Sequence, residues 1–128
     1  MITLINPDGL PEIDVYHQVA VATGTKTIYV AGQVDWDAAP DLTTQVERAY
    51  VNVHTALKAA GATFADLVKL TVYVVGWTPD KMPQLLDGIA KAAARVGETP
   101  RSPASMIGVA TLDVPEHLVE IEAIAVID

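Results

Sequence analysis

The sequence predicts an α+β fold in which two helices pack on one face of a mixed β-sheet of about six strands. Six short segments are rich in β-branched residues and bounded by turn-forming residues, as strands are. Two longer segments repeat apolar residues at helical spacing. The segments follow the order strand, strand, strand, helix, strand, helix, strand, strand, and 128 residues suit one domain over residues 1–128.

The first three strands are expected before residue 33. Ile2 to Asn6 ends at a Pro-Asp-Gly turn, and Tyr16 to Ala22 is followed by the tight turn Thr23-Gly24-Thr25. Thr27 to Gly32 comes directly after that turn. We therefore expect the second and third strands to form a hairpin.

The first helix is expected to begin near Asp41 and to end at Gly61, where glycine can close it. Two signals compete for its start. Asp41 can act as the N-cap, or Thr44 and Glu47 can form a capping box. Before this helix, Asp35 and Asp37 flank a tryptophan, and we expect a solvated turn with a packed indole.

The second helix is expected from about Asp80 to Val96, with Gly88 weakening its middle. Its inner face should carry the apolar residues that recur at helical spacing. These are Met82, Leu86, Ile89, Ala93 and Val96.

Three more strands complete the sheet: Val68 to Val75, Ala104 to Thr111 and Val119 to Ile127. In the last one, the period of a strand places Glu120 and Glu122 on the same side. Several strands are apolar or small on both faces, yet two helices can cover only one face of a sheet. The uncovered face would be a large apolar patch, so we expect a second copy of the chain to cover it.

Charge and composition exclude several classes of function. The net charge is −8, and aromatic residues make up 5% of the chain, so a basic track or stacking platform for nucleic acid is not expected. No apolar run approaches the roughly 20 residues of a membrane span. The chain has no cysteine and no secretory signal, which predicts a cytoplasmic protein.

No metal or organic cofactor is expected either. The histidines at 17, 54 and 117 lack the spacing of metal ligands, and no glycine-rich phosphate loop is present.

Several stretches, in this order and spacing, resemble the RidA/YjgF family, formerly called the endoribonuclease L-PSP family. They are Tyr16-His17-Gln18, Tyr29-Val30-Ala31-Gly32-Gln33, Gln45 with Asn52, Ala59-Ala60-Gly61-Ala62, Asp66 to Val74, and Val119 to Val126. The resemblance covers nearly the whole chain. It implies a chorismate-mutase-like fold and a homotrimer with its sheets facing inward. It also implies a cleft for a small molecule at each subunit boundary.

Active members of this family hydrolyse reactive enamines and imines to 2-oxo acids and ammonia. The resemblance implies that Glu120 is linked to the attacking water, and that Tyr16 and Val34, the residue after Gly32-Gln33, line the cleft. In these members an arginine just before the second-last strand binds the substrate carboxylate. Arg101 is the arginine nearest to this place, but counting back from the last turn puts Ala104 at the position itself.

Two functions remain open at this point. One is an enzyme that hydrolyses a small imine or enamine acid, with Arg101 or a backbone amide holding the carboxylate and Glu120 positioning water. The other is a binding or sensor trimer that holds a small carboxylate or carbonyl ligand without turnover. For Arg101, a surface ion pair is as good an explanation as a ligand contact. A ribonuclease activity fits poorly with an acidic, histidine-poor chain.

Overall fold

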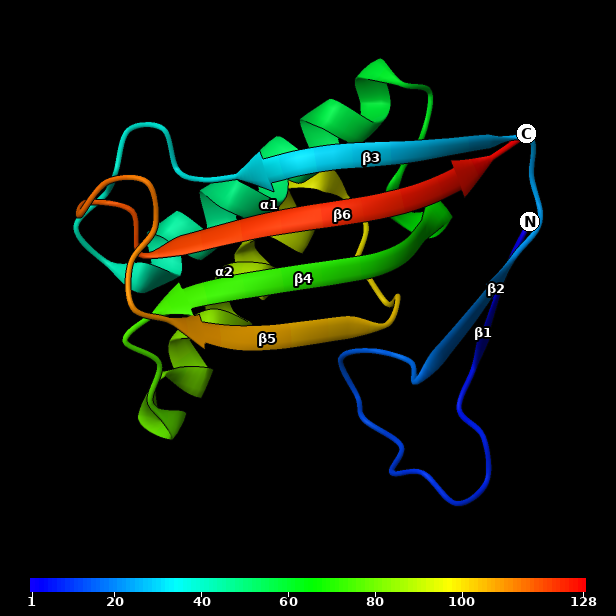
Figure 1. The fold of residues 1–128 in the computed structure, drawn as a ribbon, viewed down its shortest axis with the longest axis horizontal. Helices are drawn as coiled ribbons and strands as arrows, with labels where there is room; N and C mark the ends of the chain where they lie inside the picture. The colour runs from blue at the N-terminus through cyan, green and yellow to red at the C-terminus, as the bar shows by residue number, and fades with distance from the viewer.

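The structure is a computed structural model that describes residues 1–128 (Figure 1). Its strands are β1 (Ile2–Ile5), β2 (Val19–Ala22), β3 (Lys26–Gln33), β4 (Leu67–Val75), β5 (Ala104–Val109) and β6 (Val119–Ile127). Its helices are α1 (Leu42–Ala59) and α2 (Met82–Val96), with short 3₁₀ turns at Phe64–Asp66 and Pro79–Lys81.

The main sheet has four strands in the order β3-β6-β4-β5. Strands β4 and β5 are parallel, and the other two pairs are antiparallel, so the sheet is mixed as predicted. Both helices lie behind it on the same face (Figure 1). The α+β fold class is therefore confirmed.

The predicted hairpin between the second and third strands is wrong. β2 pairs with β1 in a separate two-stranded sheet, which stands apart from the main sheet as an N-terminal arm (Figure 1). The backbone N–H of Thr23 donates to the Met1 carbonyl at 2.9 Å, so the turn serves β1 instead of a hairpin with β3. Gly24 packs so closely on the end of β6 that an added Cβ would lie 2.6 Å from the Ile127 carbonyl oxygen. These contacts direct β2 away from β3.

The helix termini follow the predicted signals. Asp41 caps α1, since its Oδ2 accepts from the backbone N–H of Thr44 at 2.8 Å, and this hydrogen bond lowers the pKa of the Asp41 carboxyl. Gly61, just beyond the end of α1, has a φ of 83° that favours glycine. The Thr44–Glu47 capping box does not form.

The buried face of α2 differs from the predicted stripe. Leu85, Gly88 and Ala92 are buried, whereas Met82 is 40% exposed and Leu86 is 38% exposed. The cause is Gly88: a Cβ added there would lie 2.6 Å from Cβ of a valine on α1. The helices touch at Gly88, and this contact turns Met82 and Leu86 outward, whereas Ile89 and Val96 of the predicted stripe do pack against the core.

The other face of the sheet has no helix over it. A hollow of about 410 Å³ on this face lies between β3, β6 and β4 and is lined by Tyr29, Lys69 and Glu122, among others. Tyr29 is 76% exposed here. The single chain therefore leaves large side chains on this face in contact with solvent.

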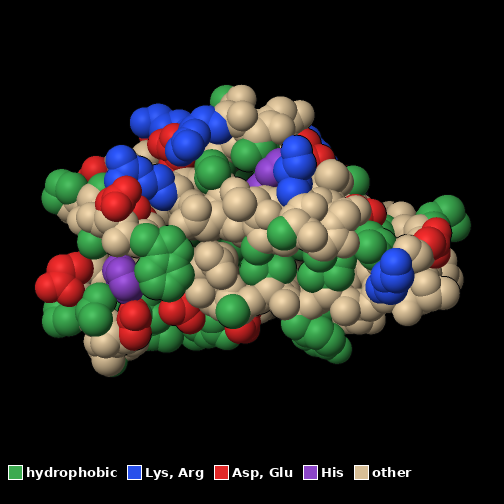
Figure 2. All heavy atoms as spheres, turned by 90° about the horizontal axis from the view of Figure 1, so that it is seen from above, with side chains coloured by type: hydrophobic (Ala, Val, Ile, Leu, Met, Phe, Trp, Pro, Cys, Tyr) green, Lys and Arg blue, Asp and Glu red, His purple; other side chains and the backbone are tan.

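The charged side chains on the molecule's surface are distributed as the acidic composition predicts. Figure 2 shows Lys and Arg side chains interspersed with Asp and Glu on the face seen from above, with hydrophobic side chains between them. No continuous basic track crosses this face. Neither helix is long and apolar enough to span a bilayer.

The contact at Gly88 leads to a stability prediction. Gly88→Ala should lower the free energy of unfolding by about 1–2 kcal/mol, because overpacking against α1 outweighs the gain in helix propensity of about 1 kcal/mol. Ala94→Gly, on the exposed side of α2, is the control and should cost about 1 kcal/mol by propensity alone. Urea unfolding measures both, and a stabilised Gly88→Ala would contradict the close helix contact.

Candidate functional site

A cavity of about 260 Å³ lies between α2 and the β5 edge of the sheet. Tyr16 and Ala104, both predicted as site residues, line it. The parallel register pairs Leu70 with Ala104 and Val72 with Met106, so these side chains share the helix-covered face of the sheet. Residues from the N-terminal arm, α1, α2, β4 and the loop before β5 complete the wall.

The wall is apolar apart from three hydroxyl groups. These belong to Tyr16, Tyr50 and Ser102, and no charged side chain lines the cavity. Ser105 also borders the cavity, but the register of β5 turns its side chain to the opposite face, where Oγ accepts a hydrogen bond from the Lys69 ammonium at 2.8 Å. Ser102 Oγ is buried without any hydrogen-bond partner. Burial raises the pKa of the Tyr50 phenol well above its ordinary value, so Tyr50 is a neutral donor at every physiological pH.

Arg101 does not line this cavity. Its Nη1 donates to the Asp14 carbonyl oxygen at 3.3 Å, and its own carbonyl accepts from the backbone N–H of His17 at 3.0 Å. Nδ1 of His17 also lies 2.9 Å from that carbonyl oxygen. Arg101 therefore ties the N-terminal arm, which carries Tyr16, to the loop before β5.

Glu120 lies on the uncovered face of the sheet, beside Gly32. The pairing of β3 with β6 shifts register between Val30 and Gln33, which is a bulge at Gly32. A Cβ added to Gly32 would overlap the Glu120 carboxylate, so a side chain at this position would displace the acid from where it now lies. Glu120 accepts no hydrogen bond in the structure, and its oxygens are free to bind water or a ligand.

The neighbouring acid is engaged. Tyr73 Oη donates to Glu122 Oε1 at 2.6 Å. This hydrogen bond raises the pKa of the Tyr73 phenol, because ionisation would place a phenolate against a carboxylate. Of the two acids in β6, only Glu120 has both carboxylate oxygens free of hydrogen bonds, which suits it to bind and activate water.

Gln33 and Val34 follow the bulge. Gln33 Nε2 donates to the Ala31 carbonyl at 3.0 Å. The Val34 side chain is buried within the chain, and its carbonyl accepts from Asn52 Nδ2 at 2.8 Å. Asn52 thus holds the segment that carries Gly32 against α1.

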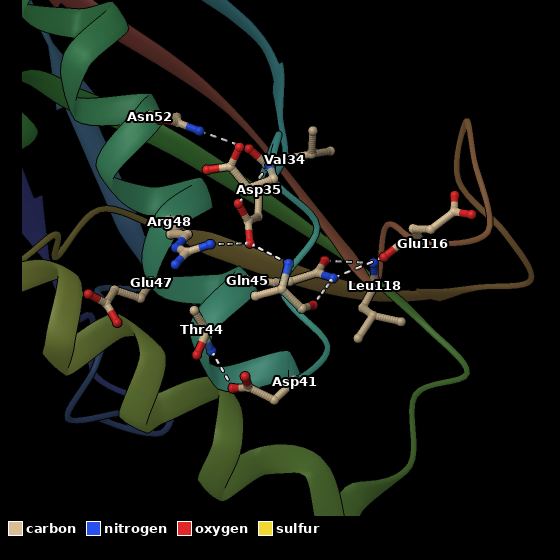
Figure 3. Close-up of polar contacts among 12 residues, drawn as sticks. Val34, Asp35, Asp41, Thr44, Gln45, Glu47, Arg48, Asn52, Glu116 and Leu118 are labelled. Atoms are coloured by element: carbon tan, nitrogen blue, oxygen red, sulfur yellow. Dashed lines mark hydrogen bonds and ion pairs between the residues drawn. The ribbon is translucent and has the colours of Figure 1, made fainter.

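Asp35 is not in a solvated turn, contrary to expectation. Its carboxylate is buried, accepts from the backbone N–H groups of Asp37 at 3.1 Å and Ala39 at 2.9 Å, and pairs with Arg48 at 3.3 Å (Figure 3). Trp36 is instead 66% exposed. In a tight loop, an acidic side chain can accept hydrogen bonds from backbone N–H groups that have no carbonyl partner. At Asp35 these hydrogen bonds outweigh the cost of removing the carboxylate from water.

Gln45 is the polar residue that links this loop to β6. Its Nε2 donates to the carbonyls of Ala39 at 2.7 Å and Glu116 at 2.9 Å, and its Oε1 accepts from the Leu118 N–H at 2.9 Å (Figure 3). Leu118 directly precedes β6, which carries Glu120. Gln45 is fully buried at a position of α1 where the helical spacing predicts an apolar residue. Because buried amides are hydrogen-bonded, a glutamine on the apolar face of a predicted helix is the feature of the sequence that could have indicated this link.

Two halves of a site are therefore present in one chain, but they do not meet. The cavity with Tyr16 and Ala104 is on the helix-covered face, and Glu120 with Gly32 is on the opposite face of the same sheet. No group of three His, Cys, Asp or Glu side chains is arranged to hold a metal ion.

Comparison with known proteins places this chain in a family. The sequence model described as Endoribonuclease L-PSP matches residues 9–127. The chain belongs to the RidA/YjgF family. The RutC family protein YjgH of Escherichia coli K12 is 33% identical over 76 residues, which are 56% of this chain and 58% of YjgH. The chain thus matches little more than half the length of this curated relative.

Solved structures of the RidA/YjgF family extend over nearly the whole chain. YyfB from Yersinia pestis, of the conserved Rid family, has 30% identity and a TM-score of 0.83, with 98% of each chain covered. The YjgF gene product of E. coli has 27% identity and a TM-score of 0.66, covering 97% of this chain and 98% of its own. E. coli TdcF, solved with bound serine, has 25% identity and a TM-score of 0.65, covering 98% and 99%.

The Gln45 network leads to the prediction for this site. Gln45→Leu removes three hydrogen bonds and leaves buried backbone groups unpaired, so the free energy of unfolding should fall by about 2–4 kcal/mol. Gln84→Leu, at an exposed position of α2 whose side chain makes no hydrogen bond, should change it by less than about 0.5 kcal/mol. Denaturant unfolding separates the two, and equal effects would contradict the linking role of Gln45.

Proposed function

We propose that the chain forms a homotrimer whose subunit boundaries contain clefts for small carbonyl or imine compounds. The observation that carries this proposal is the separation of the two half-sites by the sheet. Side chains on opposite faces of one sheet cannot act on one ligand, because the sheet's backbone lies between them. A neighbouring copy that presents its Glu120 to the cavity of the first would complete the site.

The uncovered face of the sheet supports this assembly. Large side chains such as Tyr29 lie exposed on this face, and contact with further copies of the same chain is the commonest way to cover such a face. The hollow beside Tyr29 and Glu122 is on this face. The bound serine of TdcF supports a small molecule as the ligand of a related chain.

Hydrolysis of an imine is the second candidate, and the free carboxylate of Glu120 favours it. Water held by Glu120 would add to the carbon of the C=N bond while Glu120 takes one of its protons. Glu120 passes that proton to nitrogen, which gives a carbinolamine. Glu120 then takes the hydroxyl proton and delivers it to nitrogen as well, so that the C–N bond breaks, the carbonyl forms and the neutral amine leaves. Orientation of water and two proton transfers through one carboxylate are enough for this reaction.

In this proposal Arg101 is a positioning residue. Its guanidinium is engaged by the Asp14 carbonyl, so it fixes the arm that brings Tyr16 over the cavity. A role for Arg101 as a carboxylate anchor would require its side chain to leave this contact.

The assembly is tested by light scattering at micromolar concentration. The expected mass is about three times the chain mass of 13.6 kDa. Tyr29→Glu should dissociate the assembly, because it would bury a charge in the interface. Lys58→Glu, at the exposed end of α1, is the matched control and should leave it intact. A stable wild-type monomer would refute the shared cleft.

The chemistry is tested with Glu120→Gln. The substrates are the neutral imine N-benzylidenemethylamine and a 2-imino acid formed in situ by an amino acid oxidase. For either substrate that the wild type accelerates, Glu120→Gln should lose about 100-fold in kcat, because a positioned base contributes that much or more. Glu122→Gln is the control and should keep most turnover. An equal loss of kcat in both variants would contradict the role of Glu120 as the base that activates water.

A further inference from the structure

We infer that the cavity between α2 and β5 selects neutral ligands with an apolar body and one hydrogen-bonding group, and rejects carboxylates. This inference rests on the proposed function, since it names the ligand class of the same cleft. It follows from the charges around the cavity, from a buried hydroxyl group without a hydrogen-bond partner and from the size of the cavity.

The charges oppose an anion. No cation lines the cavity, and a buried carboxylate without a cation or several hydrogen bonds is costly. The nearest arginine along the chain, Arg101, is engaged by the Asp14 carbonyl. In the proposed trimer the neighbour adds Glu120, which is another acid. The net charge of −8 makes the approach of an anion still less favourable.

One buried hydroxyl group at the cavity has no partner in the chain. Ser102 is 3% exposed and its Oγ makes no hydrogen bond. The neutral phenol of Tyr50 also lines the cavity. Buried hydroxyls are nearly always paired, so the unpaired Ser102 Oγ at the cavity wall indicates a missing partner. A carbonyl, amide or imine of a ligand would supply it without bringing a charge.

The volume limits the ligand to about one ring with a small substituent. A cavity of about 150 Å³ with apolar walls is known to hold benzene. The cavity here has about 260 Å³ and walls such as Val72, Leu85 and Met106. An aromatic amide, ketone or imine of this size would place its ring on the apolar wall and its polar group near Ser102 or Tyr50.

Benzamide and benzoate test the inference, because they have the same shape and differ in charge at pH 7. Isothermal titration calorimetry on the full-length protein should give at least tenfold tighter binding of benzamide. The double variant Ser102→Ala with Tyr50→Phe should bind benzamide about three- to tenfold more weakly, as expected for lost hydrogen bonds. The double variant should keep its Tm, since the hydroxyls it removes are unpaired. Thr55→Ala, an exposed hydroxyl on α1, is the control and should bind like the wild type.

A second variant tests the charge argument directly. Ala104→Arg would place a cation at the cavity wall, and it should reverse the preference so that benzoate binds more tightly than benzamide. Tighter binding of benzoate to the wild type, or binding of neither probe, would overturn the inference. Unchanged benzamide affinity in the Ser102 and Tyr50 double variant would overturn the role of the hydroxyls.

Light scattering on the same samples separates this inference from the proposed function. If the protein is a trimer that prefers benzoate, the proposed shared cleft stands and the proposed neutral ligand class is wrong. If it is a monomer that prefers benzamide, the ligand class stands, because the cavity walls belong to one chain, and the shared cleft is wrong.

Discussion

The rest of this molecule depends on one constraint: its two helices cover only one face of the main sheet. Two helices pack on one face and contact each other at Gly88, where the absence of a side chain lets them approach. All apolar contacts that the chain can supply by itself are made on that face. The other face carries Tyr29, Glu120 and Glu122 in the open, and this asymmetry is why the two halves of the candidate site are separated.

Polar contacts at the end of β3 keep the acidic half in place. Gly32 in the bulge leaves room for the Glu120 carboxylate, and Asn52 holds the backbone just beyond it. Gln45 joins the same helix to the residue before β6. Because Gln45 is buried with both ends of its amide hydrogen-bonded, and Asn52 fixes the backbone after the bulge, the orientation of Glu120 depends on α1 as well as on its own strand.

The two halves differ in chemistry as well as in position. The cavity wall is apolar and uncharged, with the Ser102 hydroxyl lacking a partner, whereas the Glu120 half provides a free carboxylate. A neutral imine or carbonyl compound suits both halves: its body fits the apolar wall, and its reacting carbon would face an acid that can hold water. A carboxylate ligand suits neither half.

The sequence by itself determined the α+β class, the extent of both helices and the shared face of Glu120 and Glu122, and it limited the start of α1 to two capping signals, of which the structure uses Asp41. Each depends on residues close together in the chain, where period and capping chemistry act directly. Tertiary structure decided the pairing of β2 with β1, the burial of Asp35, the inner face of α2 and the contact of Arg101 with Asp14. Those features depend on competition between segments that are distant in the chain, as when β1 and β3 both could pair with β2. Local patterns cannot resolve that competition, because each alternative satisfies the same backbone hydrogen bonds.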